Sequence, residues 1–167
     1  MHVLGLHASP LRRVILGAAI AAWAAVVNPV APAAEVQIGE LRDLSLGTWP
    51  GSGDLEAEGR HCVLGGPAGR YAVRLTGTGP GGAFSLSNQI HELAYQVFYN
   101  DGSGYEEARA GATLTGQRGS PNNNQFNRCR SGGMSPQRIR VTIRESDLSR
   151  ASAGLYTGAL SVLVMPE

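Results

Sequence analysis

Short runs in which apolar and polar residues alternate are the feature of this sequence that most constrains its fold. Glycine- and proline-rich turn signals separate these runs, and no long helical period is present. Several short strands at such spacing predict an all-β sandwich or barrel. The clearest runs are Tyr71, Val73 and Leu75; then Leu93, Tyr95, Val97 and Tyr99; and then Ile139, Val141 and Ile143.

The stretch from Ala153 to Glu167 reads as a turn followed by a strand, with no later strand in the sequence for it to pair with. Both faces of this strand are mostly apolar, which predicts that it is covered on both sides. An unpaired edge beside an apolar groove tends to capture a strand of another chain, so assembly is expected rather than catalysis. One face carries Leu160, Val162 and Val164, and the other carries Ala159, Ser161, Leu163 and Met165.

Residues 1–33 have the pattern of a bacterial secretory signal peptide. Arg12 and Arg13 precede the apolar run from Val14 to Val27, and Ala31-Pro32-Ala33 supplies a small-residue cleavage site. The run is about fourteen residues long, whereas a membrane-spanning helix needs about 20, so an uncleaved anchor is the weaker alternative. We therefore expect an exported protein in which residues 34–167 form a single domain.

Charge narrows the range of partners. The chain has 14 basic residues, all of them arginine, against 13 acidic ones, and loss of two arginines with the signal leaves a net charge of about −1. With no basic surplus, nucleic acid is not an expected partner, and neither is a membrane after signal cleavage.

Two cysteines, Cys62 and Cys129, remain in the mature part of the chain. In an exported protein two cysteines allow one intramolecular pairing, so we predict a disulfide between them. The alternative is a reactive Cys62 activated by the neighbouring His61.

The sequence predicts no catalytic, cofactor-binding or metal-binding residues, and no cofactor. The segment Gly77–Gly82 satisfies G-x-G-x-x-G, but the strand pattern after it favours a glycine-rich turn over the helix that a nucleotide site requires. The mature histidines, His61 and His91, lack metal-ligand spacing and are interpreted as surface residues. Glu106 and Glu107 are interpreted as solvated loop charges, and G-x-S-x-G is absent, so an enzyme is not expected.

Four segments, in order, resemble the spore coat protein U domain family, which includes subunits of archaic chaperone–usher pili. The resemblance extends from about Leu41 to Met165. The segments are Leu44-Ser45-Leu46-Gly47-Thr48-Trp49, Phe84-Ser85-Leu86, Leu93-Ala94-Tyr95-Gln96-Val97-Phe98 followed by Asp101, and Ala153-Gly154-Leu155-Tyr156-Thr157-Gly158-Ala159-Leu160-Ser161-Val162.

The resemblance implies an immunoglobulin-like, pilin-type β-sandwich that lacks its final strand. It implies a secreted structural subunit, whose groove is filled first by a periplasmic pilus chaperone and then by the N-terminal extension of a neighbouring subunit at the usher. The protein would pass through the periplasm to the cell surface or a fimbrium. The acceptor groove and final strand would involve Tyr156, Leu160, Val162 and Val164, with Tyr156 packing or hydrogen bonding at the corner of the strand.

The sequence departs from the family in two respects. Only Glu35 to Arg42 precede the first family segment, so we expect a chain that accepts a strand without offering one, and both cysteines lie later than is usual. The alternative function is a self-contained periplasmic or surface binding module on the same fold. In that case its own N-terminal segment would cover the groove and the loop from Gly116 to Gly133, read as the least ordered part, would carry recognition.

Overall fold

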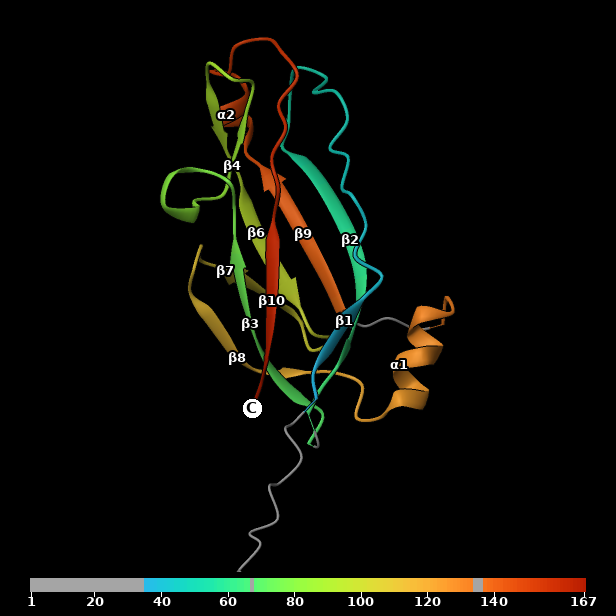
Figure 1. Cartoon of the computed structure of the whole chain (residues 1–167). Helices are drawn as coiled ribbons and strands as arrows, with labels where there is room; N and C mark the ends of the chain where they lie inside the picture. The colour runs from blue at the N-terminus through green and yellow to red at the C-terminus, as the bar shows by residue number, and fades with distance from the viewer. Residues whose placement is uncertain (1–34, 67, 134–136) are drawn as a thin grey trace, which may run out of the picture. The chain divides into compact units, whose positions relative to one another are not determined.

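The computed structural model describes residues 35–66, 68–133 and 137–167, so the predicted signal peptide lies outside the described residues. Residues Ala33–Glu167 form one compact unit, and the strands described in it pair with one another in antiparallel fashion (Figure 1). Its strands are β1 (Gln37–Gly39), β2 (Leu55–Leu64), β3 (Arg70–Thr76), β4 (Ser85–Ser87), β5 (Glu92–Ala94), β6 (Gln96–Asn100), β7 (Tyr105–Ala108), β8 (Thr113–Arg118), β9 (Gln137–Ile143) and β10 (Ser161–Pro166).

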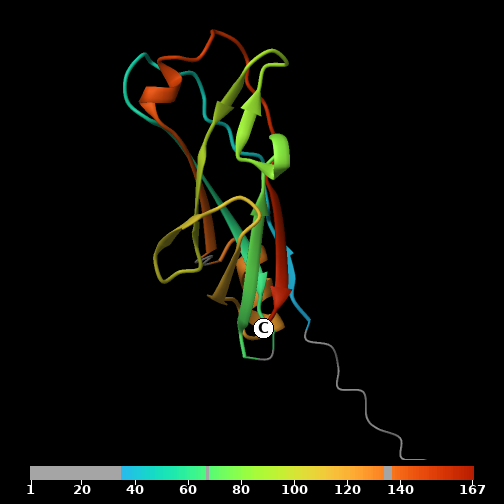
Figure 2. The ribbon, with the colours of Figure 1, turned by 90° about the vertical axis from the view of Figure 1, so that its left-hand side faces the viewer.

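Two sheets and a hairpin make up this unit. The larger sheet has the order β1-β2-β9-β6-β7, the smaller has the order β10-β3-β8, and β4 pairs with β5. The smaller sheet is visible in Figure 2, where green β3 lies beside red β10. Two short helices, α1 (Asn123–Arg130) and α2 (Glu145–Leu148), connect strands of the two sheets.

The core lies between the sheets and is built from the alternating runs of the sequence. Val73 and Leu75 of β3 meet Val97 of β6 and Val141 of β9 in one buried cluster. Their polar neighbours point the other way, as the period of two requires. The predicted fold class is therefore confirmed: this is an all-β, immunoglobulin-like sandwich.

The prediction that the last strand is covered on both faces is wrong. Leu163 is 53% exposed, whereas Val162 and Val164 are partly buried and pack against the core. The strand also begins at Ser161, one residue after Leu160. It is a surface strand of a two-layer sandwich, so only one of its faces meets the other sheet.

The region from Gly116 to Gly133 is more regular than the sequence reading expected. β8 extends to Arg118, and α1 follows, with the side chain of Asn122 accepting a hydrogen bond from the Gln125 backbone N–H at its N-terminus. Such a cap satisfies one of the N–H groups that a helix start leaves unpaired. Glu106 and Glu107 are exposed as expected but lie in β7 rather than in a loop.

The glycine-rich segment after β3 forms a 3-10 turn, Pro80–Gly82, and leads into the β4–β5 hairpin. Its compactness requires glycine, because a Cβ atom on Gly77 would lie 2.1 Å from the carbonyl oxygen of Ala83. No α-helix begins there, so the geometry of a nucleotide-binding turn does not arise.

Candidate functional site

A groove of about 310 Å³ opens between the two sheets, along β10 on one side and residues 41–46 on the other. Its floor is formed by the inward faces of β2 and β9, so the groove leads directly to the hydrophobic core. Most of the lining is apolar. The lining residues are Leu41, Arg42, Asp43, Leu44, Leu46, Gly59, Arg60, His61, Leu86, Tyr95, Ile139, Val141, Gly158, Ala159, Leu160 and Val162.

The first wall is an extended segment that belongs to neither sheet. Leu44 and Leu46 alternate inward and pack against the core, while Ser45 between them is exposed. Gly59 in β2 makes room for this wall, since a Cβ atom there would come within 2.8 Å of Leu44 Cδ2. Among the described backbone hydrogen bonds, none involves residues 41–50.

The second wall is β10 with the residues just before it. Val162 pairs with Leu75 in the register with β3, and Val164 pairs with Val73. Leu160 and Val162 line the groove itself, whereas Val164 lies further along the strand and packs against the core. Tyr156 is outside the groove lining: its hydroxyl donates a hydrogen bond to the Ser152 carbonyl oxygen at 3.0 Å, which fixes the turn before the strand.

The open edge of β10 differs in charge from the edge strands β7 and β8, which both carry charged side chains. β10 pairs with β3 on one side, and on its other side no strand among the described residues pairs with it. None of its residues, Ser161–Pro166, is charged. By contrast, edge strand β7 carries Glu106 and Glu107, and charged residues on an edge are a common protection against pairing with another chain.

His61 lies at the floor of the groove, and its interpretation as a surface residue is wrong. Its side chain is 1% exposed, because β2 points it inward next to Gly59. Its Nε2 atom lies 2.9 Å from the Tyr99 hydroxyl, which in turn lies 2.6 Å from the Tyr71 hydroxyl. Burial lowers the pKa of His61 from 6.5 to about 4, so the ring is neutral at neutral pH. His91 is exposed, as the sequence reading expected.

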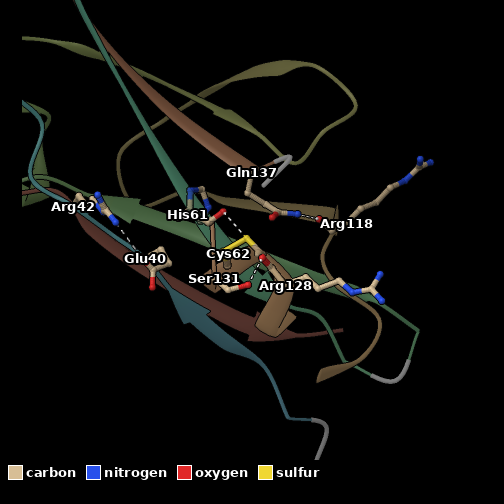
Figure 3. The surroundings of a disulfide bond; sticks show 9 residues. Glu40, Arg42, His61, Cys62, Arg118, Arg128, Ser131 and Gln137 are labelled. Atoms are coloured by element: carbon tan, nitrogen blue, oxygen red, sulfur yellow. Dashed lines mark hydrogen bonds and ion pairs between the residues drawn. A yellow bond between two sulfur atoms is a disulfide. The ribbon is translucent and has the colours of Figure 1, made fainter. Parts of the chain in front are cut away.

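The disulfide between Cys62 and Cys129 forms as predicted, with the Cα atoms 5.9 Å apart (Figure 3). Cys62 follows His61 in β2, so its side chain points away from the main core. There it meets Phe126 and Cys129 of α1, which with Leu64 form a second, smaller buried cluster. The bond therefore fixes α1 to the outer face of β2 and leaves no reactive thiol at this site.

The described part of the chain offers little for other kinds of site. No group of three or more histidine, cysteine or acidic side chains within it is arranged to hold a metal ion. Among the same residues, no helix is both long and apolar enough to cross a bilayer.

Comparison with known proteins adds a likeness of fold. No protein-family profile matches the sequence, and no curated protein matches it. The fold of this chain is similar to that of a chain in a solved structure, which is described as a chaperone–tip adhesin complex vital for synergistic activation of CFA/I fimbriae biogenesis. The match has a TM-score of 0.55 at 16% identity and covers 79% of this chain, which spans 41% of the matching chain.

This likeness supports the pilin-type sandwich and not a specific family. The resemblance to spore coat protein U domains continues to rest on the four sequence segments quoted above, since no family profile matches. A fimbria-like fold that contains a disulfide is typical of proteins outside the cytoplasm.

Proposed function

We propose that this protein is an exported structural subunit of a surface fibre of the chaperone–usher type, and that its groove accepts an extended strand from another polypeptide. A periplasmic chaperone supplies the strand before assembly, and a neighbouring subunit supplies it in the fibre. The protein passes through the periplasm to the cell surface. The proposal extends the fold likeness to a fimbrial complex and the family segments of the sequence.

The uncharged edge of β10 beside a groove that reaches the core carries this proposal. A strand placed there would form main-chain hydrogen bonds with β10, and its inward side chains would cover the partly exposed Leu44, Leu160 and Val162. The segment 41–46 would border the inserted strand on the other side. We assign Leu160 and Val162 to contacts with the inserted strand, Val164 to the same wall, and Tyr156 to holding the turn.

The arrangement of the N-terminal residues favours this function over the self-contained binding module. That alternative expects Glu35 to Leu41 to fold back beside the last strand. β1 instead pairs with β2, with Ile38 opposite Val63, and Leu41 belongs to the wall of the groove. The described N-terminal residues therefore border the groove and leave the edge of β10 open.

A self-complemented variant tests the proposal on the protein alone. An Asn-Gly turn and a six-residue strand of alternating valine and threonine are appended after Glu167, so that the added strand forms a hairpin antiparallel to β10. If the groove accepts a strand, the melting temperature rises by about 5 °C or more. The control extension has aspartate in place of valine, and equal melting temperatures for the two extensions would refute the proposal.

A matched pair of substitutions tests the same site in the exporting cell. Val162→Asn places a polar side chain against the groove, whereas Leu163→Asn places the same side chain on the exposed face of the same strand, and neither change adds a charge to the edge of β10. Burying an unpaired polar group is costly, so Val162→Asn is expected to reduce incorporation into fibres strongly while Leu163→Asn preserves it. Immunoblotting of sheared surface fibres measures the outcome, and equal incorporation of both variants would contradict the proposal.

A further inference from the structure

Two large apolar side chains project from adjacent loops at one end of the sandwich. Ile90 is 83% exposed and Leu155 is 82% exposed, more than any other large hydrophobic residue that the structure describes. Their loops are joined by a β-bridge, in which the Ser87 and Thr157 backbones exchange hydrogen bonds of 2.8 and 3.0 Å. In Figure 1 this is the end at which α2 and β4 lie.

The loop that carries Ile90 is held in one conformation by its own polar groups. The Asn88 Oδ1 atom accepts hydrogen bonds from the backbone N–H groups of Ile90 at 3.1 Å and His91 at 2.7 Å. Ser87 Oγ accepts another from the Gln89 N–H at 3.0 Å. Gln89 itself has a φ of +77°, a left-handed conformation that costs energy for a residue other than glycine.

The loop before β10 is fixed as well, through the hydrogen bond from Tyr156 to Ser152. Both exposed side chains are thus presented by ordered turns. Residues of this kind make good anchors for a protein–protein contact, because little conformational freedom is lost on binding.

This apolar end is continuous with the groove. Leu86 precedes Ser87, and Gly158 follows Thr157, and both Leu86 and Gly158 line the groove. A strand that lies along β10 therefore emerges beside Ile90 and Leu155. Antiparallel pairing is somewhat the more stable arrangement, and it would run the inserted strand from the Pro166 end of β10 toward the Leu160 end.

We propose that Ile90 and Leu155 dock against the folded body of the subunit whose strand occupies the groove. This inference rests on the proposed function, in which the inserted strand precedes that body in its sequence, so that the body lies over this end. The partner surface is apolar, since both anchors are aliphatic side chains. The contact sets the angle between successive subunits, and it adds to the binding free energy that the inserted strand contributes.

Site-specific photo-crosslinking in cells that export and assemble the protein tests the inference. p-Benzoylphenylalanine replaces Ile90 or Leu155 at the apolar end, Leu160 in the groove, and Gln125 on the exposed face of α1 as a control. Mass spectrometry identifies each crosslinked polypeptide and the segment attached. We expect position 160 to attach to an extended terminal segment of a polypeptide, and positions 90 and 155 to attach to the folded domain of that same polypeptide.

The outcomes separate the two proposals. If position 160 crosslinks to an extended segment but positions 90 and 155 attach no more of that polypeptide than position 125 does, the docking inference is wrong and the proposed function stands. If position 160 attaches to no extended segment, the proposed function fails and the docking inference fails with it.

A double variant measures the strength of the contact. Ile90→Ser with Leu155→Ser leaves the melting temperature unchanged, because both side chains are exposed in the isolated chain. The non-covalent complex between this variant and the partner that crosslinking identifies is expected to dissociate about tenfold faster than the complex of the native chain with the same partner. Leu163→Ser, an exposed residue on the outer face of β10, serves as the control, and equal dissociation rates for both variants would overturn the inference.

Discussion

The buried side chain of His61 should make the fold less stable in acid. Its ring is buried beneath the groove against Tyr99, and burial lowers its pKa from 6.5 to about 4. In the unfolded chain the ring regains its ordinary pKa. Between about pH 6.5 and about pH 4 the unfolded chain therefore binds a proton that the folded chain does not.

The size and sign of the effect follow from these two pKa values. A difference of about 2.5 pH units, at 1.36 kcal/mol for each unit, corresponds to about 3 kcal/mol. Because the folded-state pKa of this base is lowered, its contribution to the free energy of unfolding is complete above about pH 6.5. That contribution falls as the pH drops through this range and is lost below about pH 4.

Urea unfolding of the mature chain at about pH 7.5 and about pH 4.5 measures this contribution. The native chain is compared with His61→Gln, whose neutral amide can still bond to the Tyr99 hydroxyl, and with His91→Gln as the control. Carboxylates also titrate, and the pKa of Glu58 is lowered by its hydrogen bond from Tyr105, but all three proteins share these groups. The pH-dependent loss should shrink by about 2–3 kcal/mol in His61→Gln only.

The reasoning is refuted if the free energy of unfolding of His61→Gln falls with pH in parallel with that of the native chain. It is also refuted if His91→Gln, a substitution of an exposed histidine outside the groove lining, gives the same reduction.

Three further variants test interactions that stabilise the fold. Replacing Cys62 and Cys129 with alanine removes a cross-link between residues 67 apart, which should lower the free energy of unfolding by about 4 kcal/mol in urea titrations, and an unchanged midpoint would contradict this. Asn122→Ala removes the cap of α1 and should cost about 1 kcal/mol, with faster amide exchange in that helix as the check. Tyr156→Phe deletes the hydrogen bond to Ser152 and should cost about 1 kcal/mol by the same titration; a larger loss than for the alanine cap variant would point to lost packing instead.

The core of the fold was predictable because its strands carry large apolar residues at every second position. Val73 and Val141 show this pattern plainly, and both are buried where the alternation places them. β2 lacks the signal, since the residues that it points inward include Ala57, Gly59 and His61. When the inward residues of a strand are small or polar, the sequence shows no alternation of apolar and polar residues. The burial of His61 could therefore not be predicted from the sequence pattern.

α1 was missed for a related reason. Only Phe126 and Cys129 of its eight residues are buried, too few for a helical period to be seen in the sequence. The helix is stabilised instead by the cap from Asn122 and by the disulfide. The disulfide depends on where the fold places Cys62. The Asn122 cap could have signalled a helix start, but asparagine is equally common in turns.

The groove was partly predictable. The alternation of the last strand placed Leu160 and Val162 in its wall, whereas the opposite wall was not foreseen. Leu44 and Leu46 alternate over too few residues, and their segment pairs with neither sheet. The position of this segment depends on the space that Gly59 leaves for the side chain of Leu44. These two residues are not close in the sequence, so no local pattern predicts their contact.

The strand order also bears on when the domain can form. β3 lies at the centre of the smaller sheet, yet its partner β10 is the last strand that the structure describes, with Pro166 opposite Tyr71. Under the proposed function the chain would cross a membrane from its N-terminus, so that β3 would emerge before β10 and remain unpaired on one side until β10 follows. Pairings between such distant segments are slow to form, so a chain exported in this way would pass through a period of exposure to proteolysis and misassociation.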